Sequence, residues 1–197
     1  GEGIPIDLTE AAKWLTKSAE HENPNAQLII YDMYKNGEGV PKDDNEATKW
    51  LNKVNENPKN TNADTQFNFG LMYQYGRDIK IDYAEAARWY QKAALQNHAE
   101  AQSNLAFLYQ KGKGVPKNYA EALNLHQKAA LEGIAYSQYI LGWVYEDGKW
   151  GVQKNPTEAI KWYNQAAENG NASSQYALGE IYYEGKYLTQ DMPTAIK

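Results

Sequence analysis

The chain has 197 residues, a formal net charge of −5, 42% hydrophobic residues and no cysteine. The acidic balance argues against nucleic-acid binding, which needs clustered lysine and arginine. The lack of cysteine excludes disulfides, thiol catalysis and thiolate metal sites. No window holds the roughly eighteen apolar residues that a membrane span requires. These bounds predict no direct membrane span and leave a cytoplasmic and a periplasmic or secreted location both open.

One sequence unit recurs along the whole chain at a nearly constant spacing. Its most regular position is a tyrosine, and the spacings are 39, 36, 36 and 37 residues between Tyr34, Tyr73, Tyr109, Tyr145 and Tyr182. A period in this range is typical of a helical solenoid, whose units stack because none buries its apolar face alone. The approximate units are 1–22 (a half repeat), 23–61, 62–97, 98–133, 134–170 and 171–197 (incomplete).

Each unit predicts two helices, and the chain opens with a helix of the second type, from Asp7 to Glu20. Helices of the first type carry an Ala-Gln or Ser-Gln pair at their start and have apolar residues three and four apart. They end at a glycine, which accepts the left-handed cap conformation. A small residue inside them predicts close approach of the paired helix, at Gly70, Ala106, Gly142 and Gly179. Tyr31 fills this slot in the first full unit, so packing there must differ.

Helices of the second type begin with Asp or Asn three residues before a glutamate, the spacing of a capping box. The pairs are Asp7/Glu10, Asp43/Glu46, Asp82/Glu85, Asn118/Glu121 and Asn155/Glu158. Four residues after each glutamate comes a large apolar residue, at Trp14, Trp50, Trp89, Leu125 and Trp162. Because this tryptophan stripe recurs at one position of the repeat, we expect it to pack in the core. The pattern predicts five complete antiparallel helix pairs between half-units.

The repeat resembles the Sel-one-like repeat (SLR) family, a relative of tetratricopeptide repeats. The run from Ala101 to Ala130 matches the family pattern closely, with Leu125-His126 in place of its Trp-Tyr, and the run from Ser137 to Ala167 matches with one residue inserted in its loop. The resemblance covers essentially the whole chain. It implies an all-α, right-handed superhelical α-solenoid of antiparallel helix pairs. Since both ends cut a unit in two, we expect a fragment of a longer array, with fraying or self-association at the cut ends.

The resemblance also implies that the first helix of each unit lines a concave face. Two positions of that helix then face a partner, and their residues vary from one unit to the next. We expect a protein or peptide to bind this face, at Leu28, Asp32, Phe67, Leu71, Phe107, Tyr139, Trp143, Tyr176 and Glu180. Ser103 holds the remaining position, and Glu146, Asp147, Glu180 and Glu184 predict an acidic rim. The alternative is that some of these aromatic residues pack against neighbouring repeats, as Tyr139 and Tyr176 could.

The sequence favours an interaction protein over an enzyme. It holds no nucleophile–base set and no histidine cluster at metal-ligand spacing, so we expect no catalytic residue, cofactor or metal. The glycine pairs around 37–39 and 112–114 follow helices and lack the Lys-Ser/Thr of a phosphate loop. By resemblance, the expected role is a bacterial scaffold or adaptor for envelope, secretion or host-interaction complexes. An immunity or inhibitor protein that blocks a toxin or enzyme is the alternative. A β-lactam-hydrolase-like role is disfavoured, because the family members linked to it are rich in cysteine.

Overall fold

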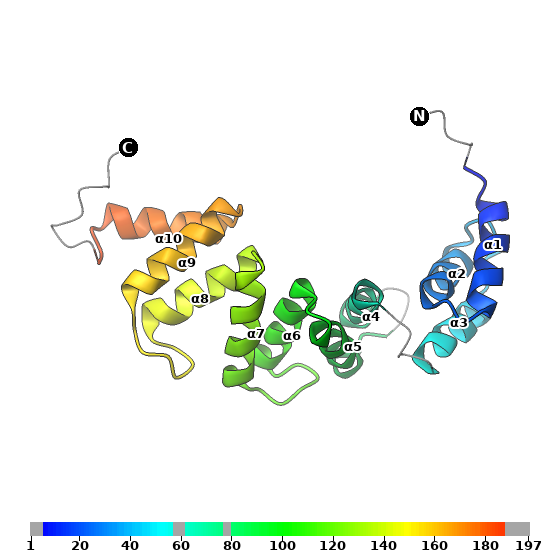
Figure 1. Ribbon diagram of the computed structural model, residues 1–197, viewed down its shortest axis with the longest axis horizontal. Helices are drawn as coiled ribbons and strands as arrows, with labels where there is room; N and C mark the ends of the chain where they lie inside the picture. Colours follow the sequence, from blue (N-terminus) through cyan, green and yellow to red (C-terminus); the bar gives the residue numbers. More distant parts are fainter. Residues whose placement is uncertain (1–5, 57–61, 77–79, 188–197) are drawn as a thin grey trace. The chain divides into compact units, whose positions relative to one another are not determined.

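The computed structural model describes residues 6–56, 62–76 and 80–187, which form ten α-helices and no β-strand. The helices appear in chain order in Figure 1. Their bounds are α1 Leu8–Glu20, α2 Pro24–Asn36, α3 Asp44–Glu56, α4 Ala63–Tyr75, α5 Tyr83–Leu95, α6 Ala99–Lys111, α7 Tyr119–Leu131, α8 Ala135–Asp147, α9 Pro156–Glu168 and α10 Ala172–Tyr183. The expected all-α repeat fold is confirmed.

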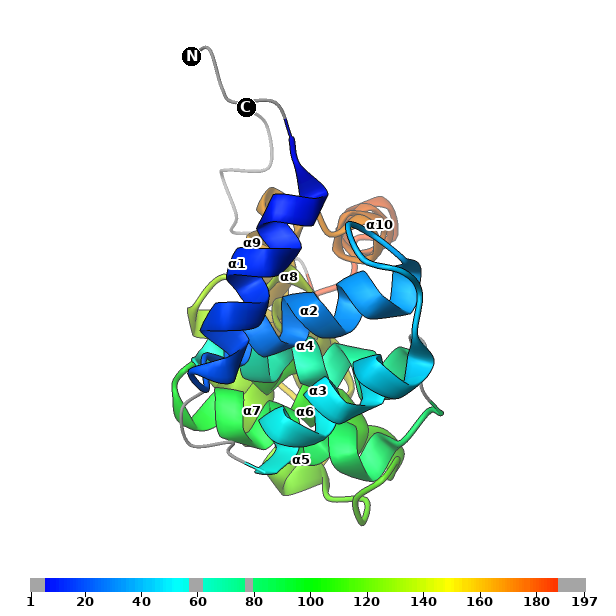
Figure 2. The same ribbon diagram turned by 90° about the vertical axis from the view of Figure 1, so that its right-hand side faces the viewer.

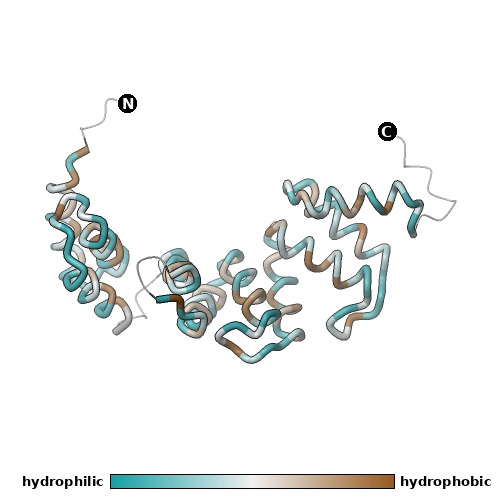
Figure 3. The backbone as a smooth tube through the Cα atoms, turned by 180° about the vertical axis from the view of Figure 1, so that it is seen from behind, coloured by the Kyte–Doolittle hydropathy of each residue, from teal (hydrophilic) through white to brown (hydrophobic). Residues whose placement is uncertain are grey.

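The chain divides into two compact units, Gly1–Asn68 and Phe69–Lys197, and the boundary falls inside α4. In the first unit α2 packs against both α1 and α3, and Figure 2 shows these three helices side by side. In the second unit the helices from α5 to α10 pack mainly against their neighbours in sequence. Along each helix, hydrophobic positions recur between hydrophilic ones (Figure 3). Packing between sequence neighbours is the arrangement of a solenoid repeat.

Helices of the two types alternate along the chain. Four pairs are complete within the described residues: α2 with α3, α4 with α5, α6 with α7, and α8 with α9. Helix α1 is of the second type and α10 is of the first type. The position of the helix that would pair with α10 lies in 188–197, outside the described residues. The fifth of the expected pairs therefore falls outside the part of the chain that the structure describes.

The second-type helices begin where the capping spacing predicts. The backbone N–H of the glutamate donates to the Asx side chain at 2.9–3.1 Å, for Asp7, Asp43, Asp82, Asn118 and Asn155. These bonds satisfy N–H groups that have no partner within the helix. Four of the glutamate side chains instead form ion pairs one turn along the helix, between Glu10 and Lys13, Glu46 and Lys49, Glu85 and Arg88, and Glu158 and Lys161.

The small residue of the first helix faces an aromatic ring of the second. A Cβ added at Gly70 would lie 2.3 Å from Cδ1 of Tyr90, and one at Gly142 would lie 2.4 Å from Cδ1 of Tyr163. Glycine is required there because the two helices approach until only a hydrogen fits. In the unit 98–133, the corresponding positions hold Ala106 on α6 and His126 on α7, whose ring is smaller than that of tyrosine. The expected close approach thus depends on two matched positions, a small residue on the first helix and a ring on the second.

The first full unit reverses the sizes in these two slots. Tyr31 on α2 is 2% exposed, and Leu51, in the matching slot of α3, is 7% exposed. A large residue on the first helix thus goes with a medium-sized residue on the second. This exchange accounts for the different packing expected at Tyr31, because a close-packed interior tolerates changes that conserve total volume.

The glutamine that opens the first helix joins successive repeats. Its Nε2 donates to a carbonyl near the end of the preceding second helix, from Gln27 to Ala19 (3.0 Å), Gln102 to Ala94 (3.4 Å), Gln138 to Ala130 (3.0 Å) and Gln175 to Ala167 (3.2 Å). The last carbonyls of a helix have no partner within it. The Ala-Gln and Ser-Gln pairs therefore carry a side-chain cap that the sequence pattern did not reveal.

The tryptophan stripe is buried in some units and exposed in others. Trp89 is 2% exposed and stacks on Phe69 with ring centroids 4.6 Å apart, and Trp50 is 7% exposed. Trp162 is half-buried. Trp14 is 59% exposed, so its placement in the core is wrong. No described helix precedes α1, and its indole instead donates to Oε1 of Glu10 at 2.7 Å.

Candidate interaction site

A hollow of about 500 Å³ opens between α8 and α10 in the second unit. We call it the α8–α10 hollow, and its lining consists of Tyr139, Trp143 and Glu146 from α8, Tyr163 from α9, and Ala172, Ser173, Tyr176, Ala177 and Glu180 from α10. Within α8 and α10 these residues recur at spacings of three and four, which places them on one face of each helix. Two successive first-type helices therefore form its walls.

The aromatic side chains of the hollow differ in depth. Tyr163 is 2% exposed and belongs to a buried cluster with Ala159, Leu178 and Ile181. Tyr139 and Trp143 are half-buried and pack against that cluster. Tyr176 is 68% exposed. The hollow thus has an aromatic base that is part of the core and a tyrosine at its margin that contributes little to the core.

Each carboxylate of the hollow accepts a tyrosine hydroxyl. Tyr163 donates to Oε2 of Glu146 at 2.8 Å, and Tyr176 donates to Oε1 of Glu180 at 2.8 Å. Burial and then the bond to Glu146 raise the pKa of Tyr163 far above its ordinary value. The bond to Glu180 raises the pKa of Tyr176. Both hydroxyls therefore stay protonated at neutral pH and donate to the carboxylate oxygens.

The acidic rim divides into paired and unpaired groups. Asp147 forms an ion pair with Lys149, and Glu184 forms one with Lys186 at 3.2 Å. Within the described residues, neither Glu146 nor Glu180 has a basic group within 4.0 Å. The two carboxylates that line the hollow are thus the ones whose charge is not neutralised by a direct ion pair.

Of the nine predicted partner-binding residues, the structure gathers Tyr139, Trp143, Tyr176 and Glu180 around this hollow. The other five lie on earlier first-type helices. They are Leu28 and Asp32 on α2, Phe67 and Leu71 on α4, and Phe107 on α6. Asp32 is exposed and the other four are half-buried. A partner-binding strip that runs through Phe67, Leu71 and Phe107 stays a prediction.

Ser103, at the remaining variable position, faces the interior instead of a partner. It is 5% exposed and accepts a hydrogen bond from Ser137 at 2.9 Å. Ser137 in turn lies 2.9 Å from Nδ1 of His126, which is fully buried. Burial lowers the pKa of His126 from 6.5 to about 3, so the ring is neutral at neutral pH. The expectation that this position faces a partner in every unit is wrong at Ser103.

Two aromatic residues in or near the hollow were not predicted from the sequence. Tyr163, which follows Trp162 of the stripe, is not singled out by the sequence pattern, yet its ring lines the hollow. Trp150 lies in the lengthened loop after α8, stacks on Tyr119 at 5.4 Å and meets Trp143 edge-on at 5.8 Å. Lys149 Nζ lies 3.8 Å from the centroid of Trp143. In the sequence, the one residue inserted in this loop is the feature that could have indicated a local change of packing.

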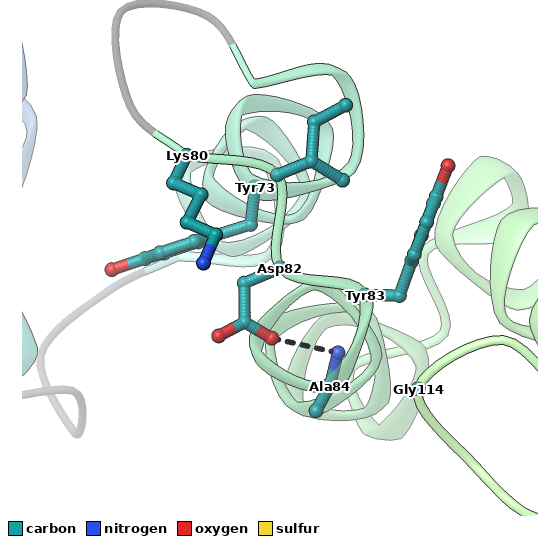
Figure 4. A pocket seen from close by; sticks show the side chains of 7 residues that line it. Tyr73, Lys80, Asp82, Tyr83, Ala84 and Gly114 are labelled. Atoms are coloured by element: carbon teal, nitrogen blue, oxygen red, sulfur yellow. Dashed lines mark hydrogen bonds between the residues drawn. The ribbon is translucent and has the colours of Figure 1, made fainter.

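A second hollow, of about 610 Å³, lies where the loop after α6 meets the start of α5 (Figure 4). Two of its polar groups already have partners, since Asp82 caps α5 and the hydroxyl of Tyr83 accepts a long bond from Lys113 at 3.4 Å. A Cβ on Gly114 would lie 2.2 Å from the carbonyl carbon of Tyr83. A Cβ on Gly39 would lie 2.2 Å from the carbonyl oxygen of Leu8. The glycine pairs thus seat a loop against the preceding second-type helix.

Among 6–56, 62–76 and 80–187, no three His, Cys, Asp or Glu side chains come together as a metal ion would require. None of the described helices is long and apolar enough to cross a membrane.

The Sel1 repeat model matches residues 1–23, 32–54, 63–98, 99–134, 135–171 and 172–197. The chain belongs to the Sel1 repeat family. Sel1 repeat proteins are generally protein-interaction scaffolds and are typically non-catalytic. No curated protein gives a significant match to this Sel1 repeat chain.

The solved structures that share its fold include two that are about one third identical to it. A protective antigen present in uropathogenic Escherichia coli strains, which displays an SLR fold, is 34% identical with a TM-score of 0.75. That match covers 88% of this chain but only 36% of the antigen. A Sel1 repeat protein from Oxalobacter formigenes is 36% identical with a TM-score of 0.71, covering 93% of this chain and 74% of that one.

Proposed function

We propose that this chain is a scaffold or adaptor that binds a partner protein or peptide with its first-type helices, and that the α8–α10 hollow is the main contact. Four of the predicted residues gather around one hollow, and in the part of the chain that the structure describes its two carboxylates form no direct ion pair. Aromatic side chains in a recess provide large contact areas and dominate the binding energy of many interfaces. Tyr176, at the margin of the hollow, is largely exposed, so its ring offers contact area to a partner and contributes little to the stability of the fold.

The family and the chemistry of the described residues both favour binding over catalysis. The histidine–serine pair of His126 and Ser137 is fully buried, so no substrate reaches it. A general base must lie within hydrogen-bond reach of the group that it deprotonates. Both solved relatives come from bacteria, which favours a bacterial complex at the envelope, in secretion or at the host surface. The partner's identity decides between such a complex and an immunity or inhibitor role.

Quantitative affinity capture tests this function. The wild-type chain, Tyr176→Ala and Tyr183→Ala serve as baits in extract of the source cell, followed by mass spectrometry. Tyr183 is 93% exposed, lies on the same helix and does not line the hollow, so it is a matched control. We expect at least one protein to be retained by wild type and Tyr183→Ala and depleted with Tyr176→Ala. An identical set of captured proteins for all three baits would overturn the assigned site.

A further inference from the structure

The α8–α10 hollow combines two kinds of group that attract a cation. The rings of Tyr139, Trp143 and Tyr176 line it together with the carboxylates of Glu146 and Glu180. An aromatic face attracts a positive charge within about 6 Å of its centroid. A carboxylate attracts the same charge over a longer range, and its lone pairs accept N–H bonds. A positively charged group thus has favourable partners on both walls of the hollow.

Both carboxylates keep acceptor capacity after their tyrosine bonds are counted. Glu146 accepts through Oε2 and Glu180 through Oε1, so Oε1 of Glu146 and Oε2 of Glu180 remain as acceptors. The tyrosine hydroxyls fix one oxygen of each carboxylate, which limits the positions of the other. A carboxylate held in place before binding loses less rotamer freedom when a ligand arrives.

The lysines of this region form their direct ion pairs with carboxylates outside the hollow. Lys149 and Lys186 are paired with Asp147 and Glu184, and neither lysine lines the hollow. Lys149 also lies 3.8 Å from the centroid of Trp143. The indole that forms part of the wall therefore already attracts a cation from outside the hollow. Lys186 also attracts the charge of Glu146 from beyond ion-pair distance, but among the described residues neither carboxylate of the hollow forms a direct ion pair.

We infer that the α8–α10 hollow takes an arginine side chain from a basic segment of the partner protein. The inference rests on the proposed scaffold function and names the partner's chemistry. A planar guanidinium stacks on an aromatic ring. Its N–H donors point outward in the plane of the guanidinium itself, where carboxylates accept them. An ammonium group lacks this planar fork, so arginine fits two walls of rings and carboxylates better than lysine. The net charge of −5 favours approach of a basic partner.

A short peptide tests this inference without knowledge of the natural partner. The probe is acetyl-Gly-Ser-Arg-Ser-Gly-amide, titrated into the ¹⁵N-labelled chain and followed by amide chemical shifts. The same peptide with citrulline in place of arginine keeps the shape and removes the charge. We expect saturable shifts confined to α8, α9 and α10 with arginine and at least about tenfold weaker binding with citrulline, the factor that 1.4 kcal/mol makes in Kd.

Variants of the chain provide the second arm. Glu146→Gln and Glu180→Gln still accept the tyrosine hydroxyls and remove one charge each, while Glu184→Gln removes a charge outside the hollow. We expect the first two to weaken arginine-peptide binding and Glu184→Gln to leave it nearly unchanged. Equal effects of the three variants, shifts elsewhere in the chain, or equal binding of the citrulline peptide would overturn the inference.

The two proposals fail in different ways. If the captured partner is lost with Tyr176→Ala but binds Glu146→Gln/Glu180→Gln as it binds wild type, the scaffold function stands and the arginine inference is wrong. If no protein depends on Tyr176, the scaffold site is wrong, whatever the peptide does.

Discussion

The ring of Tyr163 occupies the space that a side chain at residue 142 would need, since a Cβ on Gly142 would lie 2.4 Å from its Cδ1 atom. Gly142→Ala should therefore lower the melting temperature. Overpacking at such a contact costs about 1–3 kcal/mol, more than the gain of up to about 1 kcal/mol from replacing a helical glycine.

Gly179→Ala is the matched control for this substitution. Gly179 holds the same slot on α10, yet no described residue lies within 4 Å of a Cβ added there. Without a clash, alanine should stabilise α10 by up to about 1 kcal/mol. Thermal melts of both variants measure the difference, and a stabilising Gly142→Ala would contradict the close packing of α8 on α9.

Burial of Gln138 predicts a second effect on stability. Its Nε2 donates to the carbonyl of Ala130, and its Oε1 accepts from Asn169 at 2.9 Å. Gln138→Ala leaves buried groups without partners and should cost about 1–3 kcal/mol. Gln175→Ala removes the corresponding bond at an exposed position and should cost less. The midpoints of urea unfolding check the order, and equal midpoints would refute it.

The tryptophan stripe should show graded effects. Trp89→Ala removes a buried ring stacked on Phe69 and should cost about 3–5 kcal/mol. Trp14→Ala removes an exposed ring and should change stability by less than about 1 kcal/mol. Hydrogen exchange gives a second measurement, since loss of Trp89 should speed exchange in α4 and α5. Comparable losses for the two variants would contradict the burial difference.

His126 should make stability depend on pH. Its pKa in the folded chain, about 3, lies below its ordinary value of 6.5, so the unfolded chain binds the proton more tightly. This contribution is complete above about pH 6.5 and is lost as the pH falls toward 3. The groups around the imidazole of His126 are uncharged between pH 3 and pH 7. Ser137 contacts Nδ1, and Tyr136 and Trp150 pack on the ring.

The test compares melting temperatures of the wild-type chain and His126→Leu between pH 7 and pH 4. Leucine is the residue that the first full unit uses in this slot, at Leu51. Acid effects from carboxylates are common to both proteins, so the difference between the two curves isolates the histidine. We expect the wild type to lose more stability than His126→Leu, and parallel curves would refute the assignment.

The features that could be predicted from the sequence are those that depend on the spacing of residues along the chain. The caps at Asp82 and Asn155 depend on residues three apart, and the repeat period brings Tyr139 and Tyr176 to equivalent positions of successive first-type helices. Such features follow from spacing alone. They account for the helix starts and for four of the residues around the hollow.

Burial depends on which helix covers a position, and spacing does not specify that. Trp14 has the same place in the repeat as Trp89, yet it is exposed because no described helix covers it. Ser103 turns inward because the smaller ring of His126 leaves room for a hydroxyl network. Trp150 reaches Trp143 through a lengthened loop. These outcomes arise from packing between units, which the repeat pattern does not encode.

The most direct test of the scaffold function is the affinity of a purified captured partner for Tyr176→Ala, measured beside its melting temperature. Tyr176 lines the hollow and is 68% exposed, whereas Trp143 also packs on the core, so truncating Trp143 would change stability as well. The account predicts at least about tenfold weaker binding at an unchanged melting temperature, with Tyr183→Ala binding like wild type. Wild-type affinity for Tyr176→Ala would contradict it, as would an equal loss of affinity in Tyr183→Ala.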